Sequence, residues 1–370
     1  MRTYSFFMLV VLFMAAASCS SNTNNPEEPF RLLWEFAYQG VPEGLSLVTL
    51  APEIIGNNYI AISPDRRLTN LDPKTGEVLW SNELPENAWI TTNNLLHDSD
   101  TFYIKIDQTS KIVGWDILTG TKKWEGALPS GTFFDFRHDA LDSQNLYLTG
   151  NQLSFFVFRK NGEFLLEKKM DKNPRALISD GTNIYVSQAW RPEGSESSYG
   201  RIVSYNSDSM DEEWSYTTQK GGFYTASMQL VDNVLYSGTV SGNGTFISLN
   251  ANTGKRIWAK DLITYRFLVE NDTIYVNNSL NIVALDSNTG KELWRTDFGV
   301  GDASDNIAYL NGYLYHSHGS ALFILDAATG EVVHREPVAP DGTPFGNVAA
   351  ANGRVFAQSD YHLYAYEAWK

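Results

Sequence analysis

Short runs of apolar residues alternate with turn-forming residues along most of the chain. Residues 306–336 illustrate the pattern, because they divide into four such runs, at 306–310, 313–318, 321–326 and 331–336. The apolar residues do not recur at the spacing of an amphipathic helix. Short apolar runs bounded by Gly, Asn and Asp are typical of strands joined by tight turns. The pattern therefore predicts an all-β protein built from short antiparallel strands.

A string of the form Asp-x-x-Thr-Gly-x-x-x-Trp recurs along the chain. It is complete at residues 72–80, 116–124 and 286–294, with near-copies at 250–258 and 326–334. Degenerate copies lead to Leu166 and Trp214, and Trp34 has no turn motif before it. Asp or Asn opens a tight turn by bonding the backbone two residues on, and Gly supplies the positive φ that closes a hairpin. We therefore expect each Trp on an outermost strand, where its ring covers the gap between neighbouring sheets.

A second pattern, in which a turn cluster precedes an apolar residue and usually Tyr, gives an independent count. It recurs eight times, at Tyr59, Tyr103, Tyr147, Tyr185, Tyr236, Tyr275, Tyr315 and Phe356. Both series repeat about every forty-two residues, and a four-stranded unit with such a period is a propeller blade. The sequence therefore predicts an eight-bladed β-propeller made of four-stranded antiparallel blades.

The two ends of the folded region complete each other in this scheme. Residues 348–367 supply inner strands but stop before their turn motif, whereas Trp34 belongs to an outer strand with no inner strands before it. We therefore expect the last blade to combine strands from both termini. A single propeller domain then spans residues 30–370, and the ring has no open blade edge.

With its leading position included, the string is similar to the tryptophan-docking motif A-x-D-x-x-T-G-x-x-x-W of quinoprotein-type propellers. Ala284 supplies the leading alanine in one copy, and the position is Gly114, Ser248, Asn70 or Ile324 elsewhere. Small residues suit a site over which a Trp ring lies flat, so Asn70 and Ile324 predict less regular docking in their blades. The resemblance covers nearly all of the folded region and implies the propeller fold.

The same family includes quinone-dependent alcohol and sugar dehydrogenases. It also includes non-enzymatic lipoproteins, such as the BamB type that assists outer-membrane β-barrel assembly. The alcohol-oxidising members often stack the quinone on a vicinal disulfide, but this chain has no cysteine after Cys19. It also lacks the length for the extra loops of those enzymes. The resemblance therefore implies a non-enzymatic protein without a cofactor, similar in layout to the BamB-type lipoprotein.

The first residues of the chain indicate export. Arg2 precedes an apolar run at 6–17, which is too short to span a bilayer and is typical of a secretory signal. The run ends in the string Ala-Ala-Ser-Cys at 16–19, which resembles the lipobox of bacterial lipoproteins. An ordinary signal peptide with a chance cysteine near its cleavage site is the alternative.

The lipobox resemblance implies a signal peptide at 1–18 and acylation of Cys19. Several acyl chains anchor a protein stably where one does not. The polar residues at 20–29 have no apolar side chain to bury, so we expect a flexible tether at 19–29 that begins with the lipidated cysteine. Ser20, which follows the cysteine, resembles the pattern of lipoproteins sent to the outer membrane. We expect an envelope protein held at the outer membrane, with a periplasmic or a surface-facing orientation both open.

Charge narrows the choice of partner. The formal net charge is -15, so the surface should repel phosphate backbones and anionic membrane faces. We expect no nucleic-acid partner and membrane contact through the lipid anchor only. We also expect a monomeric propeller.

Candidate binding residues lie in the connections between blades, where propellers commonly bind ligands. Aromatic and Arg side chains are the types that dominate protein interfaces. The candidates are Trp89, Phe136, Arg137, Arg175, Trp190, Arg191, Tyr224, Tyr265, Arg266 and Phe345. The alternative is that each ring packs between adjacent blades while each Arg pairs with a local carboxylate. Trp190 and Arg191 belong to the longest insertion, at 188–201, which should protrude from the body. Such a loop could grip a partner, and the alternative is a merely solvated excursion.

No catalytic motif accompanies these candidates. The chain lacks a Gly-rich phosphate loop, a nucleophile elbow and a zinc-protease helix motif. His316 and His318 alternate on one strand and share a face, but two ligands do not make a metal site. We therefore expect no catalytic residue and no metal.

Three functions remain for such a propeller. The first is an envelope scaffold that binds protein partners, including β-barrel assembly components, through its inter-blade loops. The second is a cell-surface binder of glycans or small molecules that uses the same aromatic residues. The third is a quinone-dependent dehydrogenase. The layout of the chain favours the first.

Overall fold

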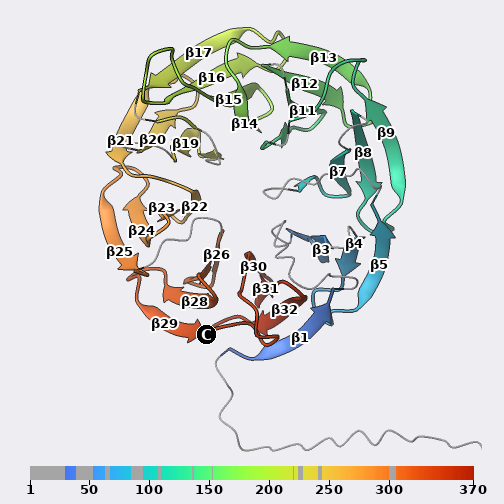
Figure 1. Ribbon diagram of the computed structural model, residues 1–370, viewed down its shortest axis with the longest axis vertical. Helices are drawn as coiled ribbons and strands as arrows, with labels where there is room; N and C mark the ends of the chain where they lie inside the picture. The colour runs from blue at the N-terminus through green and yellow to red at the C-terminus, as the bar shows by residue number, and fades with distance from the viewer. Residues whose placement is uncertain are drawn as a thin grey trace, which may run out of the picture.

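The propeller predicted from the repeat is confirmed by a computed structural model of the chain. The structure describes residues 30–38, 53–62, 67–84, 95–106, 110–135, 137–151, 153–219, 221–223, 228–240, 244–299 and 306–370. These residues form eight four-stranded antiparallel sheets, set as blades around a central axis (Figure 1). They contain no helix, and so nothing in the described ranges forms a helix long and apolar enough to cross a bilayer.

Each blade follows the same order, from an innermost strand at the axis to an outermost strand at the flank. Blade 1 consists of β2 (Glu53–Ile55), β3 (Asn58–Ile62), β4 (Arg67–Leu71) and β5 (Val78–Glu83), and blade 2 of β6 (Leu96–His97), β7 (Thr101–Ile106), β8 (Lys111–Asp116) and β9 (Lys122–Ala127). Blade 3 consists of β10 (Ala140–Leu141), β11 (Asn145–Gly150), β12 (Ser154–Arg159) and β13 (Phe164–Lys169), and blade 4 of β14 (Pro174–Ser179), β15 (Asn183–Trp190), β16 (Tyr199–Asn206) and β17 (Glu212–Thr218).

Blades 5 to 8 repeat the arrangement, and the last one uses both ends of the chain. Blade 5 consists of β18 (Gln229–Val231), β19 (Val234–Gly238), β20 (Thr245–Asn250) and β21 (Arg256–Asp261), and blade 6 of β22 (Arg266–Glu270), β23 (Thr273–Asn277), β24 (Asn281–Asp286) and β25 (Glu292–Asp297). Blade 7 consists of β26 (Ile307–Leu310), β27 (Tyr313–His318), β28 (Ala321–Asp326) and β29 (Val332–Glu336), and blade 8 of β30 (Val348–Ala351), β31 (Arg354–Gln358), β32 (His362–Glu367) and β1 (Leu32–Ala37).

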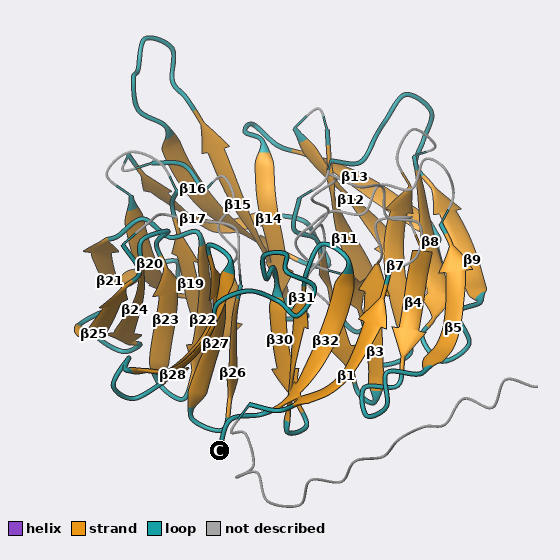
Figure 2. Cartoon of the chain, turned by 60° about the horizontal axis from the view of Figure 1, so that its bottom comes forward, coloured by secondary structure: helices purple, strands orange, loops and turns teal. Residues whose placement is uncertain are grey.

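The ring has two different rims, which Figure 2 shows above and below the strands. The lower rim carries the Asp-x-x-Thr-Gly turns, the C-terminus and the start of β1. The upper rim carries the described connections from an outermost strand to the innermost strand of the next blade, such as 170–173 between β13 and β14 and 337–347 between β29 and β30. The β15–β16 connection rises highest above it, as expected for the longest insertion. Strand β15 extends to Trp190, so the insertion begins as a paired hairpin and only 191–198 form the loop.

The turns of the lower rim show why the string needs its residue types. Asp286 Oδ1 accepts hydrogen bonds from Thr289 N at 2.8 Å and from Thr289 Oγ1 at 2.6 Å. These bonds hold the pKa of the Asp286 carboxyl below its usual value. Gly290 takes a φ of +68°, and a methyl group there would lie 2.7 Å from Cε3 of Trp258. Both the backbone and the neighbouring ring therefore require glycine.

Each docked Trp joins its own blade to the turn of the next blade. Its Nε1 donates to a backbone carbonyl of that turn in five cases: Trp34 to Pro73 at 3.1 Å, Trp80 to Ile117 at 2.9 Å, Trp214 to Ala251 at 2.8 Å, Trp258 to Ser287 at 2.8 Å and Trp294 to Ala327 at 3.0 Å. The structural role predicted for Trp between blades is confirmed. These contacts link neighbours around much of the ring.

The prediction of less regular Trp docking in the blade of Asn70 is wrong. Trp80 docks on Ile117 like the other rings, because Asn70 Nδ2 also donates to the Ile117 carbonyl at 3.0 Å and to Asn58 Oδ1 at 2.9 Å. The amide is therefore held by hydrogen bonds beside the ring. In blade 7, where His334 replaces Trp, its ring packs instead on Phe30 and Trp369, at centroid distances of 5.6 and 5.0 Å.

The second repeat pattern also has a structural cause. In three blades the Tyr hydroxyl donates to the Asp that opens the innermost hairpin: Tyr103 to Asp98 at 2.6 Å, Tyr147 to Asp142 at 2.5 Å and Tyr185 to Asp180 at 2.7 Å. The rings themselves are buried or nearly so. The turn and the Tyr therefore recur together because each satisfies the other inside one hairpin.

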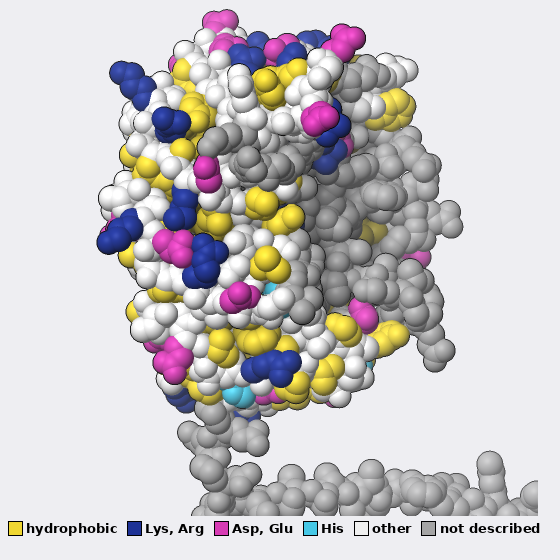
Figure 3. Space-filling model, turned by 60° about the vertical axis from the view of Figure 1, so that its left-hand side comes forward, with side chains coloured by type: hydrophobic (Ala, Val, Ile, Leu, Met, Phe, Trp, Pro, Cys, Tyr) yellow, Lys and Arg dark blue, Asp and Glu magenta, His cyan; other side chains and the backbone are white. Residues whose placement is uncertain are grey.

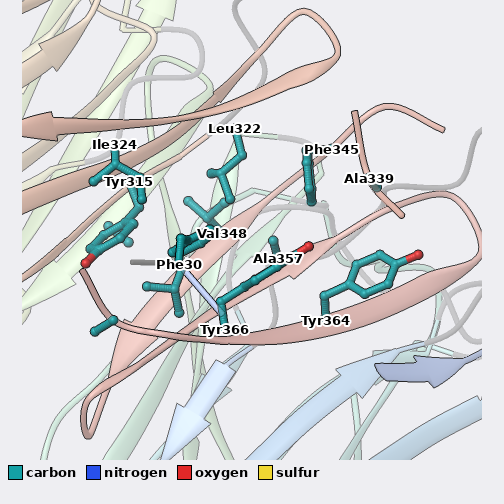
Figure 4. Close-up of a cluster of buried hydrophobic side chains, with 13 residues drawn as sticks. Phe30, Tyr315, Leu322, Ile324, Ala339, Phe345, Val348, Ala357, Tyr364 and Tyr366 are labelled. Carbon is teal, nitrogen blue, oxygen red and sulfur yellow. The ribbon is translucent and has the colours of Figure 1, made fainter. Parts of the chain in front are cut away.

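Closure by both termini is confirmed. Strand β1 pairs antiparallel with β32, with Trp34 opposite Ala365. Phe30 stacks on Tyr366 at 4.4 Å between centroids, inside a buried cluster that also contains Phe345 and Tyr364 (Figure 4). No blade of the described ring is left with a missing outer strand.

The flank of the ring is a mixed surface. Figure 3 shows small apolar areas separated by charged and polar side chains on the side where β21 and β25 lie. Single aliphatic residues on these outermost strands are exposed, including Ile257 and Leu293. Scattered apolar residues of this kind are normal on soluble proteins.

Candidate functional site

A cavity of about 460 Å³ lies on the propeller axis. Every blade contributes to its wall through its innermost strand or the residues just before it. The lining residues are Glu53, Leu96, His138, Asp139, Ala140, Leu141, Leu177, Ile178, Ser179, Met228, Gln229, Arg266, Phe267, Leu268, Asn306, Ile307 and Asn347. A second cavity of about 340 Å³, among blades 1, 6, 7 and 8, shares Glu53 with the first. Volumes of this size accept small ligands.

Two amides on the wall are used to hold neighbouring blades together. Gln229 Nε2 donates to Phe267 O at 2.8 Å, and its Oε1 accepts from Val269 N at 3.0 Å, so β18 is joined to β22. Asn306 makes the same pair of bonds to Val348: its Nδ2 donates to the Val348 carbonyl at 2.7 Å, and its Oδ1 accepts from Val348 N at 3.0 Å. Because both ends of each amide are occupied, these side chains are parts of the scaffold.

A buried ion pair joins blades 2 and 3 beside the cavity. Lys105 Nζ lies 2.6 Å from Asp139 Oδ2, with side chains that are 6% and 10% exposed. The ammonium also donates to the Asp135 carbonyl at 2.6 Å. Asp139 Oδ1 accepts from Thr149 N at 2.8 Å and from Thr149 Oγ1 at 2.9 Å. Burial raises the pKa of the Asp139 carboxyl, and Lys105 and Thr149 oppose that rise.

His138, which directly precedes Asp139 in the chain, also lines the cavity. Its carbonyl accepts from Leu177 N at 2.9 Å, which ties the segment to blade 4. Burial, followed by the positive charges of Arg266, Lys105 and Arg137, lowers the pKa of His138 to about 4. Its Nε2 has no hydrogen-bond partner among the described residues. His138 is therefore a neutral imidazole near neutral pH, with one ring nitrogen available.

Glu53 stands at the start of the innermost strand of blade 1 and lines both cavities. Burial raises the pKa of its carboxyl to about 7. The structure gives this carboxyl no hydrogen bond or ion pair within the described residues. Glu53 therefore exchanges its proton close to neutral pH.

The predicted binding residues fall into separate places. Arg266 lines the cavity, and Tyr265 and Arg137 lie next to cavity-lining residues in the chain. Arg137 Nε contacts Asp135 Oδ2 at 3.2 Å. This pair matches the alternative in which each Arg pairs with a local carboxylate. Arg175 lies on β14, one of the inner strands that surround the axis.

Two further candidates lie on the protruding hairpin. Trp190 ends β15 and faces Tyr199 at 5.8 Å between ring centroids, with the Lys172 ammonium 5.6 Å from its ring. Arg191 is exposed in the loop. By contrast, Phe345 is 2% exposed in the buried cluster of blades 7 and 8 (Figure 4). Cys19, Trp89, Phe136 and Tyr224 lie outside the described residues.

Sequence reasoning missed Lys105, His138, Asp139 and Glu53. One signal was present, because Lys105 interrupts the apolar strand Thr101–Ile106, and a lysine inside a buried strand needs a buried partner. His138 and Asp139 directly follow a predicted candidate, Arg137, but nothing local marks them. Their position on the axis depends on how the blades meet.

The lining can be tested against a planar quinone, the cofactor of some similar propellers. Phe267 is the one aromatic residue among the described lining residues, and it is 5% exposed. Among the described lining residues, no second Phe, Tyr or Trp ring is present to form a stacking pair with Phe267. Within the described ranges, no group of three or more His, Cys, Asp or Glu side chains is placed to hold a metal ion. His316 and His318 pack around Phe298 instead.

Three solved structures show the same fold. The crystal structure of BamB from Moraxella catarrhalis has a TM-score of 0.68 and 15% identity, covering 91% of this chain and 99% of that chain. The computationally designed Ika8 protein has a TM-score of 0.67 and 13% identity, covering 88% and 98%. Quinohemoprotein alcohol dehydrogenase from Comamonas testosteroni has a TM-score of 0.68 and 11% identity, covering 92% and 76%. These identities show the fold alone.

The sequence itself identifies the family. No curated protein matches the chain. Residues 31–196 and 278–370, which make up more than half of the chain, match the sequence model of a family described as outer membrane protein assembly factor BamB. The chain belongs to this family.

Proposed function

We propose that the chain is a non-enzymatic lipoprotein scaffold of the cell envelope, anchored through Cys19, that binds protein partners through its upper rim in outer-membrane β-barrel assembly. Membership of the assembly-factor family carries this proposal. A dehydrogenase also shares the fold, so fold alone would not favour a scaffold over an enzyme. Among the described residues that line the axial cavity, Phe267 is the one Phe, Tyr or Trp, and this scarcity of stacking rings supports the scaffold.

In this proposal the lower rim lies toward the lipid anchor and the upper rim binds the partners. The described chain enters the ring at Phe30, on the lower rim, where Figure 2 also places the C-terminus. A tether at 19–29 would then span at most about 40 Å when fully extended. The upper rim lies on the opposite side, so an anchor of this length leaves its connections accessible to partners.

The upper rim offers the residue types that protein interfaces use. The hairpin formed by β15 and β16 carries Trp190, Tyr199 and the exposed Arg191 above the rim. Large aromatic rings and Arg give most binding energy per residue in interfaces. A hairpin paired up to its last strand residues is also a rigid support, which lowers the entropy cost of binding.

Site-specific photo-crosslinking in cells tests the proposal. A photoreactive amino acid at Arg191 should capture β-barrel assembly components, because the loop lies on the partner-binding rim. The same amino acid at Lys74, in a lower-rim turn, serves as the matched control and should capture none of them. Assembly components at both positions, or at neither Arg191 nor the other upper-rim connections, would count against the proposal. Protease added to whole cells distinguishes a periplasmic from a surface-facing orientation.

A small-molecule binding role is the second candidate, and one observation favours it. The axial cavity is large enough for a ligand and is lined by all eight blades. Rim binding of a protein does not need this cavity. The two roles can therefore coexist in one molecule.

A further inference from the structure

The smaller axial cavity, of about 340 Å³, carries charge of one sign on its described wall. Two charged side chains line it, Glu53 on β2 of blade 1 and Glu270 at the end of β22 in blade 6, and none of the described lining residues is Lys, Arg or His. Arg266 lines the larger cavity and begins the strand that Glu270 ends, so these two residues are about 13 Å apart along the strand. The smaller cavity therefore presents two carboxylates to a ligand, with no basic side chain on the part of its wall that the structure describes.

Neither carboxylate is used by the fold. Glu53 and Glu270 accept no hydrogen bond and make no ion pair within the described residues. Other polar groups on this wall are engaged, because both ends of the Asn306 amide are occupied and the Tyr309 hydroxyl accepts from Asn271 Nδ2 at 3.2 Å. Burial is the one cause that raises the pKa of Glu53 to about 7. A buried carboxylate without a partner costs free energy, and proteins keep such unfavourable groups mainly at functional sites.

An aliphatic surface connects the two carboxylates. Strand β22 contacts β26, β26 contacts β30, and β30 contacts β2, so the innermost strands of blades 7 and 8 lie between Glu270 and Glu53. The apolar side chains that these four strands contribute to the lining are Ile54, Leu268, Ile307, Ala308, Val348, Ala349, Ala350 and Ala351. A hydrocarbon chain gains free energy by leaving water for such a surface. The wall therefore suits a ligand with a positive charge at each end and an aliphatic body.

We propose that the smaller axial cavity binds an aliphatic diamine, with one ammonium at Glu53, the other at Glu270 and the hydrocarbon chain along β26 and β30. Each ammonium has three donors for a carboxylate, and hydrogen bonds between charged groups are stronger than neutral ones. The net charge of -15 also attracts cations toward the protein.

This proposal assigns a ligand class to the small-molecule role of the axis. It does not depend on partner binding at the upper rim, because neither glutamate lies on the protruding hairpin. Failure of diamine binding would therefore leave the crosslinking experiment on the rim unaffected, and failure of crosslinking would leave the diamine site unaffected.

Binding should depend on pH through Glu53. Its carboxyl must be ionised to attract an ammonium, and with a pKa of about 7 it loses its charge as pH falls from 8 to 6. His138 stays neutral in this range, since burial and nearby positive charges lower its pKa to about 4. Diamine affinity should therefore fall about three- to tenfold between pH 8 and pH 6. The titratable and charged groups around Glu53 are Tyr38 and Tyr59 on the protein side, and Glu270, His138, Asp139 and Arg266 on the cavity walls.

Isothermal titration calorimetry of the intact chain with cadaverine tests this inference. At pH 8 we expect saturable one-to-one binding, about tenfold or more tighter than that of pentylamine, which has the same carbon chain but one ammonium, or of MgCl₂, which lacks the aliphatic body. Glu53→Gln and Glu270→Gln should each weaken cadaverine binding about tenfold or more. Glu77→Gln, exposed in the β4–β5 turn, is the matched control and should leave it unchanged.

The pH profile separates a binding role of Glu53 from a structural one. Glu53→Gln should remove the fall in cadaverine affinity between pH 8 and pH 6, whereas Glu270→Gln should retain it. If Glu53→Gln does not fold, Glu270→Gln and the profile of the unsubstituted chain carry the test. Absence of saturable cadaverine binding, equal binding of pentylamine or MgCl₂, or undiminished binding by either variant would each overturn the proposal.

Discussion

The lower rim and the axial wall solve the same problem, joining one blade to the next, in opposite ways. On the lower rim, one contact recurs. A Trp ring lies over the Gly of the next blade's turn, and its Nε1 donates to a backbone carbonyl of the same turn. On the axis, the described junctions are of more than one kind. Gln229 and Asn306 are amide clamps, and Lys105 makes a buried ion pair.

The difference shows where this molecule can specialise. A repeated contact tolerates loss at one blade, as blade 3 illustrates with Leu166 in place of Trp, packed in a cluster with Met210 of the next turn. Of the described axial contacts, the amide clamp occurs at two junctions, those of Gln229 and Asn306, whereas the Lys105 ion pair is a different contact. These contacts set the charge and shape of one cavity, so a change there should affect both stability and binding.

The largest expected effect is at the axial ion pair. Lys105→Met leaves Asp139 buried without its partner and should lower the free energy of unfolding by about 3–5 kcal/mol. Lys111→Met is the matched control, because its ammonium also lies 2.6 Å from a carboxylate, that of Glu125, but the two side chains are 42% and 33% exposed. It should cost less than about 1 kcal/mol. Urea unfolding followed by Trp fluorescence measures both, and equal losses would contradict the contrast.

A smaller effect should separate two glycines of the lower rim. Gly254 and Gly56 both have positive φ, +66° and +62°. An added methyl group would overlap Trp214 at Gly254 but meets nothing within 4 Å at Gly56. Gly56→Ala should therefore cost about 1 kcal/mol from backbone strain alone. Gly254→Ala should cost about 2–4 kcal/mol, since displacement of the ring adds to the strain. If thermal unfolding shows the same loss for both, Trp docking contributes little.

The smallest effect should depend on pH. The pKa of Glu53 is raised from 4.5 to about 7 by burial, so the folded state binds more protons than the unfolded state between these values. Stability from this group therefore falls as pH rises through 7. Glu53→Gln removes the loss and should stabilise the protein by about 1–2 kcal/mol at pH 8.5, with little gain at pH 5. Glu35→Gln, on the exposed face of β1, should show no such difference in urea unfolding.

Most of the fold could be predicted from the sequence because its signals are local. The turn string fixes hairpins through contacts between residues a few positions apart, such as Asp286 with Thr289. The four strands expected at 306–336 were accordingly placed within one residue of β26 to β29. Closure was also predictable, since an outer strand without inner strands has one possible partner.

The site was harder to predict because it is assembled from single residues of distant blades. Side-chain type did not separate binding from packing: Phe345 looked like an interface residue but lies in the core. His138 and Glu53 carry no local motif. Burial around the axis perturbs both of their pKa values, and the positive charges of Arg266, Lys105 and Arg137 add to the shift of His138. Trp89, Phe136 and Tyr224 stay predictions.

The closure of blade 8 also imposes an order in time. Strand β1 is among the first parts of the chain to be made, but its partner β32 is among the last. Until the C-terminal strands arrive, β1 has an unpaired edge, which is prone to wrong pairing and aggregation. A chain that lacks its C-terminal strands therefore cannot complete blade 8. Pairing of the two ends thus acts as a check on length, and incomplete copies remain recognisable to chaperones and proteases.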